Sequence, residues 1–577
     1  MARRADTRSD QVIGTQDGAD EAAAPLDALL VGAALGPLRR LTPDASTLRW
    51  AGELGKHPGS TARRLGALGQ ETLRIVRGRS SVEPARGDRR FKDVAWTENP
   101  LLHRLAQSYL AGAETAGRLV EDADLDWRDK ERTRFLVQNL SEALAPSNLP
   151  LVNPASAKAA IDSGGRSLAR GAAQLVKDLR SSPRVPEMVD TSGFTVGENV
   201  ANTPGAVVLR TEVFELIQYT PQTPKVFEVP VLVVPPTINK FYAIDLATGR
   251  SLVDHSVKGG RQMFVMSWRN PDRRHADWNF DTYVGAILEA LSAVERITGS
   301  SRTVLGGICS GGILASITAA YLAHQGQQDR LAAFLLAVTV IDNAHAGTTS
   351  ALTDRNLAEL AKAKSRQDGY LDGRALAEIF AWLRPGDLIW NYWVNNYLLG
   401  RRPPAFDILF WNSDTTRMAA GLHADFVDLS MENSLTRPDA LTVLGVPIDL
   451  GRVTVDSYVV AGVTDHITPW ENCYRTTQLL GGDVRFVLST SGHIAALVNP
   501  PDNPKASFRS APGDSTENPA DSREWLAEAV TQQGSWWTDV AAWLDKRTGR
   551  KVAAPKSLGS AELPVLGEAP GTYVMQS

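Results

Sequence analysis

The chain has 577 residues, of which 43% are hydrophobic and 22% are charged, as in an ordinary soluble globular protein with a large core. Its 61 basic and 65 acidic residues leave a net charge of −4, which argues against a strongly basic nucleic-acid-binding protein. No apolar run reaches the roughly 18 residues of a membrane span, and two cysteines cannot build a disulfide framework. We therefore expect a cytoplasmic protein that binds no nucleic acid and does not span a membrane.

The N-terminal part of the chain divides into two segments of different pattern. Residues 1–85 are rich in Ala, Arg, Gly, Asp and Ser with weak periodicity, so we expect a poorly ordered extension or loosely docked helices there. Residues 86–205 place apolar residues three and four apart, as in "NPLLHRLAQSYLAGAETAGRLVE", a spacing typical of amphipathic helices. This second segment is predicted to form a mainly helical N-terminal domain.

From residue 206 to residue 577 the pattern changes to short apolar runs that alternate with helical stretches. The runs "VPVLVVPP", "RQMFVMSW" and "AAFLLAVTVID" read as strands covered on both faces of a parallel sheet. Stretches such as "FDTYVGAILEALSAVERITG" between them have the helical period. Such strand–helix alternation predicts a doubly wound α/β domain.

One interval, about residues 343–442, interrupts this alternation with helical sequence rich in Trp and Tyr. An insertion between two late strands is a typical place for a cap, so we expect a helical cap insertion here. The aromatic side chains Trp390, Trp393, Tyr397 and Trp411 are either core residues, part of a cap that excludes water, or contacts between two copies of the chain.

The segment "GICSGG", residues 307–312, follows a predicted strand and begins a predicted helix, the context of a nucleophile elbow. In such a turn Cys309 would be the nucleophile, because the positive potential of a helix N-terminus favours a thiolate. The backbone N–H of Ser310 would then contribute to an oxyanion hole. The alternative is a buried cysteine in a glycine-rich joint, since free cysteines are among the most buried residues.

Two later strands supply partners in the order nucleophile, acid, histidine that defines the α/β-hydrolase fold. The segment "YVVAGVTDHITPW" ends a strand just before Asp465, and "VRFVLSTSGHIAAL" ends the next strand just before His493. Taken alone, Asp465 could be a helix N-cap and His493 a loop residue. His466 is either an assisting site residue or a polar residue at a helix start.

A second oxyanion donor is expected from an earlier strand–helix loop, "VVPPTINKFYAIDL". Its position after a predicted strand makes a backbone N–H near Ile238 or Asn239 the candidate. The fold class predicted for the whole chain is therefore an α/β-hydrolase domain with a helical cap insertion, preceded by a mainly helical domain.

With these residues in place, the chain resembles the polyhydroxyalkanoate synthases. "DRRFKDVAW", "PPTINKFYAIDL", "GICSGG", "NYWVNNYLLG", "FDILFWNSDTTRM", "DHITPW" and "SGHIAALVNPP" look like family blocks in family order. The amino-acid sequences of these segments are most similar to those of the single-subunit class II enzymes, with class I as the alternative. Ile308 departs from the class II box, in which Ala is common at that position.

The resemblance implies that Cys309 carries the growing acyl chain, that Asp465 and His493 complete a triad, and that the substrate is (R)-3-hydroxyacyl-CoA. It also implies a homodimer associated with polyester granules and with granule proteins. We expect no metal and no cofactor besides the CoA of the substrate, because the sequence has no P-loop, no G-x-G-x-x-G and no ligand-spaced His/Cys cluster. A thioesterase or esterase of the same fold and a non-catalytic granule-coat protein are the alternatives.

Overall fold

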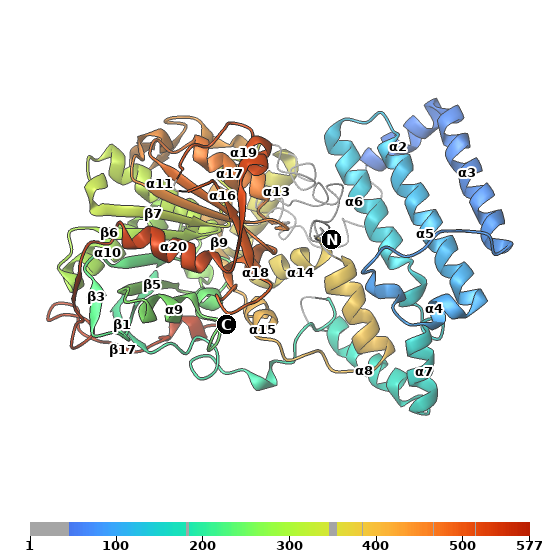
Figure 1. Cartoon of the computed structure of the whole chain (residues 1–577), viewed down its shortest axis with the longest axis horizontal. Coiled ribbons are helices and arrows are strands. Elements are labelled where there is room, and N and C mark those ends of the chain that lie inside the picture. The colour runs from blue at the N-terminus through green and yellow to red at the C-terminus, as the bar shows by residue number, and fades with distance from the viewer. Residues whose placement is uncertain (1–44, 181–183, 345–354, 384, 466, 514) are drawn as a thin grey trace, which may run out of the picture.

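The computed structural model describes residues 45–577, apart from 181–183, 345–354, 384, 466 and 514. Figure 1 shows a helical unit, coloured blue to cyan, beside a larger α/β unit that contains the rest of the chain. In the described part of the chain, no helix is both long and apolar enough to cross a membrane.

The helical unit begins within the segment expected to be poorly ordered. Its helices are α2 (Ala45–Lys56), α3 (Pro58–Val76), α4 (Ala95–Glu98), α5 (Pro100–Glu121), α6 (Trp127–Ala143), α7 (Pro154–Asp162) and α8 (Arg166–Arg180). Helix α5 begins sharply because the Asn99 side chain accepts hydrogen bonds from the N–H groups of Leu101 and Leu102, with Pro100 in the first turn.

Residues 45–76 form docked helices, one of the two alternatives given for residues 1–85. Helices α2 and α3 pack on α6 and α5. The Ser46 hydroxyl donates to Asp129 at 2.7 Å, and Arg64 pairs with Asp122 at 2.6 Å. These polar anchors join residues far apart in sequence, so local periodicity gave no sign of them. Residues 1–44 lie outside the described residues.

Within the described residues, eleven strands form one mixed sheet in the order β15-β14-β13-β12-β7-β6-β4-β5-β2-β1-β17. From β13 to β5 in this order, each strand pairs in parallel with the next. The remaining pairs of adjacent strands, at both ends of the sheet, are antiparallel. Their bounds are β1 (Gly205–Arg210), β2 (Phe214–Tyr219), β4 (Val231–Val234), β5 (Met263–Trp268), β6 (Thr303–Ile308), β7 (Leu331–Ala337), β12 (Ser457–Gly462), β13 (Val484–Ser489), β14 (Ser507–Ser510), β15 (Val530–Gln533) and β17 (Gly567–Glu568). The predicted α/β sheet is confirmed.

Strand β6 shows why the parallel strands are almost wholly apolar. Leu305 belongs to one buried core, and Val304 and Ile308 belong to a second core on the opposite face. The first core includes residues of α10 (Phe280–Thr298), α11 (Ser310–His324), α16 (Ala420–Glu432), α17 (Trp470–Arg475) and α19 (Ser522–Glu528). The second core includes residues of α9 (Leu252–Lys258), α18 (His493–Leu497) and α20 (Trp536–Asp545). Helices therefore cover the sheet on both faces.

The cap insertion, residues 343–442, leaves the sheet after β7 and returns before β12, its parallel neighbour. Besides α16, its described elements are α13 (Arg355–Asp368), β8 (Tyr370–Leu371), α14 (Gly373–Leu383), the π-helices η9 (Gly386–Trp390) and η10 (Trp393–Leu398), α15 (Asp407–Ser413), β9 (Met418–Ala419), the 3-10 helix η11 (Ser434–Thr436) and β10 (Leu441–Val443). Its mainly helical character is as predicted.

The aromatic segment of the cap insertion is where the helical unit docks. The indole N–H of Trp393 donates to the carbonyl of Asn148 at 3.0 Å, and the Tyr397 hydroxyl donates to Asp178 at 2.7 Å. Helix α8 approaches so closely that a Cβ on Gly171 would lie 1.8 Å from the carbonyl oxygen of Tyr397. This contact between two units was not among the interpretations drawn from the sequence.

Candidate active site

Cys309 lies in a strained turn between β6 and α11. Its backbone has φ 50° and ψ −123°, a conformation that L-residues rarely adopt. Glycines make the turn possible, because a Cβ on Gly311 would lie 2.2 Å from the carbonyl oxygen of Pro235 and one on Gly312 would lie 2.0 Å from Oγ1 of Thr339. The segment "GICSGG" therefore has the geometry of a nucleophile elbow.

Asp465 and His493 meet at the carboxyl edge of the sheet, although 28 residues separate them. Asp465 follows β12, and His493 is the first residue of α18 after β13. Nδ1 of His493 lies 2.7 Å from Oδ2 of Asp465, and the two side chains are 8% and 0% exposed. The acid and the histidine singled out in the sequence are thus hydrogen-bonded in a buried position.

The carboxylate of Asp465 is enclosed by hydrogen-bond donors. Its Oδ1 accepts from the N–H groups of Ile467 and Thr468, each at 2.9 Å, and its Oδ2 accepts from the Thr468 hydroxyl at 2.6 Å. Burial alone would raise the pKa of Asp465, but the charge and hydrogen bond of His493 and the bonds from Thr468 hold it below its usual value. Thr468, whose Oγ1 also lies 3.0 Å from Nδ1 of His493, was missed in the sequence.

Cys309 is the third residue of this group, because it influences the pKa of His493. Burial alone would lower the pKa of His493, but the charge and hydrogen bond of Asp465, together with a hydrogen bond and charge from Cys309, raise it to about 10. Cys309 itself is only 6% exposed. The structure therefore brings together the three residues that the sequence placed at the ends of three strands.

The predicted oxyanion donors lie on two adjoining segments. Ser310 is the first residue of α11, so its N–H has no intrahelical acceptor. The Ser310 hydroxyl accepts a hydrogen bond from the N–H of Thr237 at 2.9 Å. Asn239 pairs with Thr415 in an antiparallel bridge. In that bridge the hydrogen bond runs from the N–H of Thr416 to the carbonyl of Ile238. Among the described residues no acceptor receives the N–H of Ile238 or that of Asn239, so both remain candidate donors.

Two further residues, His466 and Cys473, are close in sequence to Asp465. His466, the possible assisting residue, lies outside the described residues. Cys473 is fully buried behind the site, and its thiol donates to the carbonyl of Thr468 at 3.7 Å. Burial and the nearby negative charge of Asp465 raise the pKa of the Cys473 thiol, so it stays neutral.

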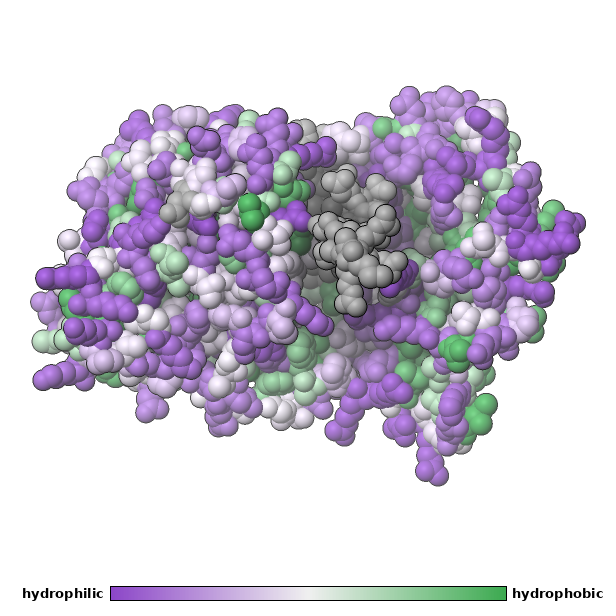
Figure 2. Space-filling model, viewed as in Figure 1, coloured by the Kyte–Doolittle hydropathy of each residue, from purple (hydrophilic) through white to green (hydrophobic). Residues whose placement is uncertain are grey.

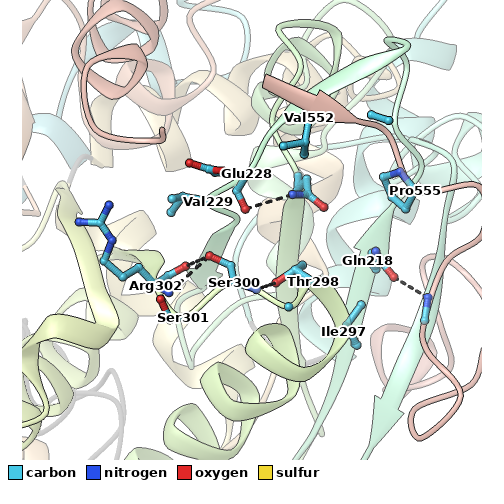
Figure 3. A pocket seen from close by; sticks show the side chains of 14 residues that line it. Gln218, Glu228, Val229, Ile297, Thr298, Ser300, Ser301, Arg302, Val552 and Pro555 are labelled. Carbon is cyan, nitrogen blue, oxygen red and sulfur yellow. Dashed lines mark hydrogen bonds between the residues drawn. The ribbon is translucent and has the colours of Figure 1, made fainter. Parts of the chain in front are cut away.

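A cavity of about 460 Å³ lies at the other edge of the sheet (Figure 3). It is lined by Gln218, Glu228, Val229, Gln262, residues 297–302, Val552, Ala553, Pro555 and Gly559. Strand β6 begins beside this cavity at Thr303 and ends at Ile308, directly before Cys309, so Thr303 and Cys309 lie about 20 Å apart at 3.3 Å per residue. The cavity is therefore separate from the candidate site. In the described ranges, no group of three or more His, Cys, Asp or Glu side chains is placed to hold a metal ion.

Comparison with known proteins identifies first the fold class of the chain and then its protein family. Residues 230–500 match the alpha/beta hydrolase fold, and residues 87–256 match the N-terminus of poly-beta-hydroxybutyrate polymerase (PhaC). Poly(3-hydroxyalkanoate) polymerase 2 of Ectopseudomonas oleovorans is 46% identical over 90% of this chain and 92% of its own length. The chain belongs to the poly(3-hydroxyalkanoate) polymerase family.

Two other relatives support the same assignment. Poly(3-hydroxyalkanoate) polymerase 1 of Ectopseudomonas oleovorans is 44% identical over 90% of this chain and 92% of its own length. The poly(3-hydroxyalkanoate) polymerase subunit PhaC of Cupriavidus necator is 38% identical over 87% of this chain and 85% of its own length. The predicted class II-like resemblance, the α/β-hydrolase fold and the acyltransferase class are thereby confirmed.

Proposed function

We propose that Cys309, His493 and Asp465 form a catalytic triad that polymerises (R)-3-hydroxyacyl-CoA through an acyl thioester on Cys309. The observation that carries the proposal is the buried hydrogen bond between His493 and Asp465, together with the influence of Cys309, which with Asp465 raises the pKa of His493. A nucleophile, a base and an orienting carboxylate in this order are the parts that covalent acyl transfer needs.

In the acylation step, the Cys309 thiolate attacks the thioester carbonyl of the substrate. A Cys309–acyl thioester forms as the bond to the CoA sulfur breaks, and the proton on His493 passes to that sulfur. The pKa of about 10 supports this order, because the imidazole then holds a proton at neutral pH before CoA departs. The N–H groups of Ser310 and Ile238 stabilise the negative charge on the carbonyl oxygen.

In the elongation step, the neutral His493 accepts the proton of a 3-hydroxyl group, and the hydroxyl oxygen attacks a Cys309 thioester. An ester bond forms, the bond to the Cys309 sulfur breaks, and the thiolate returns beside a protonated imidazole. Asp465 orients His493 rather than taking this proton itself, because its side chain is fully buried and its oxygens already accept from Ile467 and Thr468.

A thiol suits this chemistry better than a serine hydroxyl. Transfer of an acyl group from CoA to Cys309 exchanges one thioester for another, so the bound acyl group remains activated for the next ester bond. An oxyester on serine would be a lower-energy resting state. The low exposure of Cys309 and His493 supports transfer to a hydroxyl rather than to water.

The test is to incubate the purified protein with C4 and C10 (R)-3-hydroxyacyl-CoA and to measure both CoA release and polymer. We expect polymer in step with CoA, with a preference for C10 in line with the class II-like resemblance, and neither product from Cys309→Ala. Release of CoA with only free 3-hydroxy acid would indicate a thioesterase. No CoA release from the wild-type protein would indicate a granule-coat protein.

We also propose that the enzyme works as a cytoplasmic homodimer at the surface of polyester granules, alongside granule-associated proteins. Apolar residues are visible on the helical unit in Figure 2, and Leu101, Leu144, Leu151 and Ile161 on this unit are exposed. Such side chains suit an apolar polymer surface. A Leu101→Lys, Leu144→Lys variant should lose co-sedimentation with polyester particles, and retained binding would contradict the role of this surface. Light scattering of the wild-type protein would reveal the dimer.

A further inference from the structure

A residue at the base of the cap insertion holds the loop that carries the candidate oxyanion donor. Thr416 is 5% exposed and lies just before β9. Its N–H donates to the carbonyl of Ile238 at 3.3 Å, and its hydroxyl donates to the carbonyl of Thr237 at 3.2 Å. The cap insertion therefore contacts the carbonyl groups of two successive peptides in the loop after β4, Thr237–Ile238 and Ile238–Asn239.

The first of these two peptides contains the candidate donor, the N–H of Ile238. The carbonyl of Thr237 and the N–H of Ile238 belong to the same planar trans peptide, so they point in opposite directions. A hydroxyl bound to the carbonyl oxygen fixes the rotation of this peptide plane and hence the direction of the N–H. The α/β domain holds the neighbouring groups, since Trp268 donates to the carbonyl of Pro235 and the N–H of Thr237 donates to Ser310.

We infer that Thr416 is a positioning residue, by which the cap insertion aims the Ile238 N–H at the oxygen of the reacting thioester. This inference rests on the proposed function. Removal of the Thr416 hydroxyl frees the peptide to rotate, which weakens stabilisation of the oxyanion without touching the triad. A lost oxyanion donor costs about 10²–10³-fold in rate, so a misaligned one is expected to cost about tenfold.

The packing around Thr416 indicates that its position depends on the cap. Helix α14 begins at Gly373, where a Cβ would lie 2.1 Å from the carbonyl oxygen of Thr416 and 2.8 Å from Cβ of Thr415. A side chain at Gly373 would therefore push this segment away from the loop. Gly373→Ala offers a second route to the same misalignment, with the Thr416 hydroxyl intact.

The experiment compares Thr416→Val with Thr416→Ser, which keeps the hydroxyl, and with Thr298→Val as a matched control. Thr298 also donates its hydroxyl to a carbonyl, that of Val294 at 2.8 Å, but lies at the opposite edge of the sheet. Rapid mixing with (R)-3-hydroxyacyl-CoA gives the rate and amplitude of the first CoA burst. We expect a burst about tenfold slower for Thr416→Val and Gly373→Ala, with unchanged amplitude, and wild-type bursts for the other two.

A second measurement separates positioning from general damage. Iodoacetamide alkylates a thiolate without forming an oxyanion, so the rate of Cys309 alkylation should be the same in Thr416→Val and wild type. A wild-type burst rate in Thr416→Val, or an equal loss in burst and alkylation rates, would overturn the inference. If Thr416→Val does not fold, a wild-type burst rate in folded Gly373→Ala would overturn the inference instead. A burst that persists in Cys309→Ala would instead overturn the proposed function.

Discussion

Asp465 and His493 are both buried, and each remains charged in the free enzyme because of its neighbours. The pKa of Asp465 is held down by His493 and by hydrogen bonds from Thr468, and the pKa of His493 is raised by Asp465 and Cys309. A fully buried carboxylate without such donors would take up a proton. The network behind the nucleophile therefore sets the protonation states on which the chemistry depends.

Replacing Thr468 with valine is expected to shift the pH dependence of the reaction. The variant loses the 2.6 Å bond to Oδ2, so the pKa of Asp465 rises. Because the ionised carboxylate is the form that supports His493, the acid limb of the kcat/KM profile should move to higher pH. The acid limb should move by about one to two pH units, since a hydrogen bond to a charged group contributes about 1.5–3 kcal/mol and one pKa unit corresponds to about 1.4 kcal/mol.

Thr468→Ser serves as the matched control, because it keeps the hydroxyl and loses only a methyl group. We expect its pH profile to overlay that of the wild type. An acid limb that stays in place in Thr468→Val, with activity reduced equally at every pH, would show that Thr468 contributes packing alone. Steady-state CoA release from pH 4 to pH 9 gives both profiles.

At the scale of the elements, the site is built from the ends of β6, β12 and β13 and from the loop after β4. The sequence predicted these ends because each has a local signature: the glycines around Cys309, and an acid or a histidine directly after an apolar run. Thr468 had a weaker local signal, a hydroxyl three residues after the acid. Thr416 had none, because its role depends on a contact with Ile238 across 178 positions of the chain.

The docking of the helical unit could not be predicted for a related reason. An amphipathic pattern shows which side of α8 is buried, but not which segment covers it. The partner is η10, and both its close approach at Gly171 and the hydrogen bond between Tyr397 and Asp178 join segments more than 200 residues apart. The same aromatic residues would have matched a core or a dimer contact equally well.

Gly171→Ala is expected to weaken this contact. Its Cβ would lie 1.8 Å from the carbonyl oxygen of Tyr397, and overpacking of this kind costs about 1–3 kcal/mol. Gly112→Ala in α5 is the matched control, because nothing lies within 4 Å of its Cβ. Alanine should stabilise that helix by about 0.5–1 kcal/mol. Hydrogen exchange of α8 should therefore be faster in the first variant and unchanged or slower in the second, and equal protection in both would contradict the prediction.

For the whole molecule, the contacts form a chain from the helical unit to the nucleophile. The helical unit holds η10 through Trp393 and Tyr397, and the same insertion holds the loop after β4, which carries the candidate oxyanion donor, through Thr416. Helix α15 packs on η6 (Phe241–Ile244), the turn that follows this loop, and α18, which begins with His493, packs on the same turn. The placement of the helical unit is therefore connected to the enclosure of the triad.

Weaker docking of the helical unit should therefore change the fate of the acyl-enzyme. If the cap insertion is held less firmly against η6 and the loop after β4, water reaches the thioester on Cys309 more often and competes with the 3-hydroxyl acceptor. For Gly171→Ala we expect a larger share of the released CoA to be matched by free 3-hydroxy acid instead of polymer, whereas Gly112→Ala should keep the wild-type ratio. Chromatography of the acid and weighing of the polymer at equal CoA release give that ratio. An unchanged ratio in Gly171→Ala, despite faster hydrogen exchange in α8, would show that the α/β unit alone excludes water from the triad.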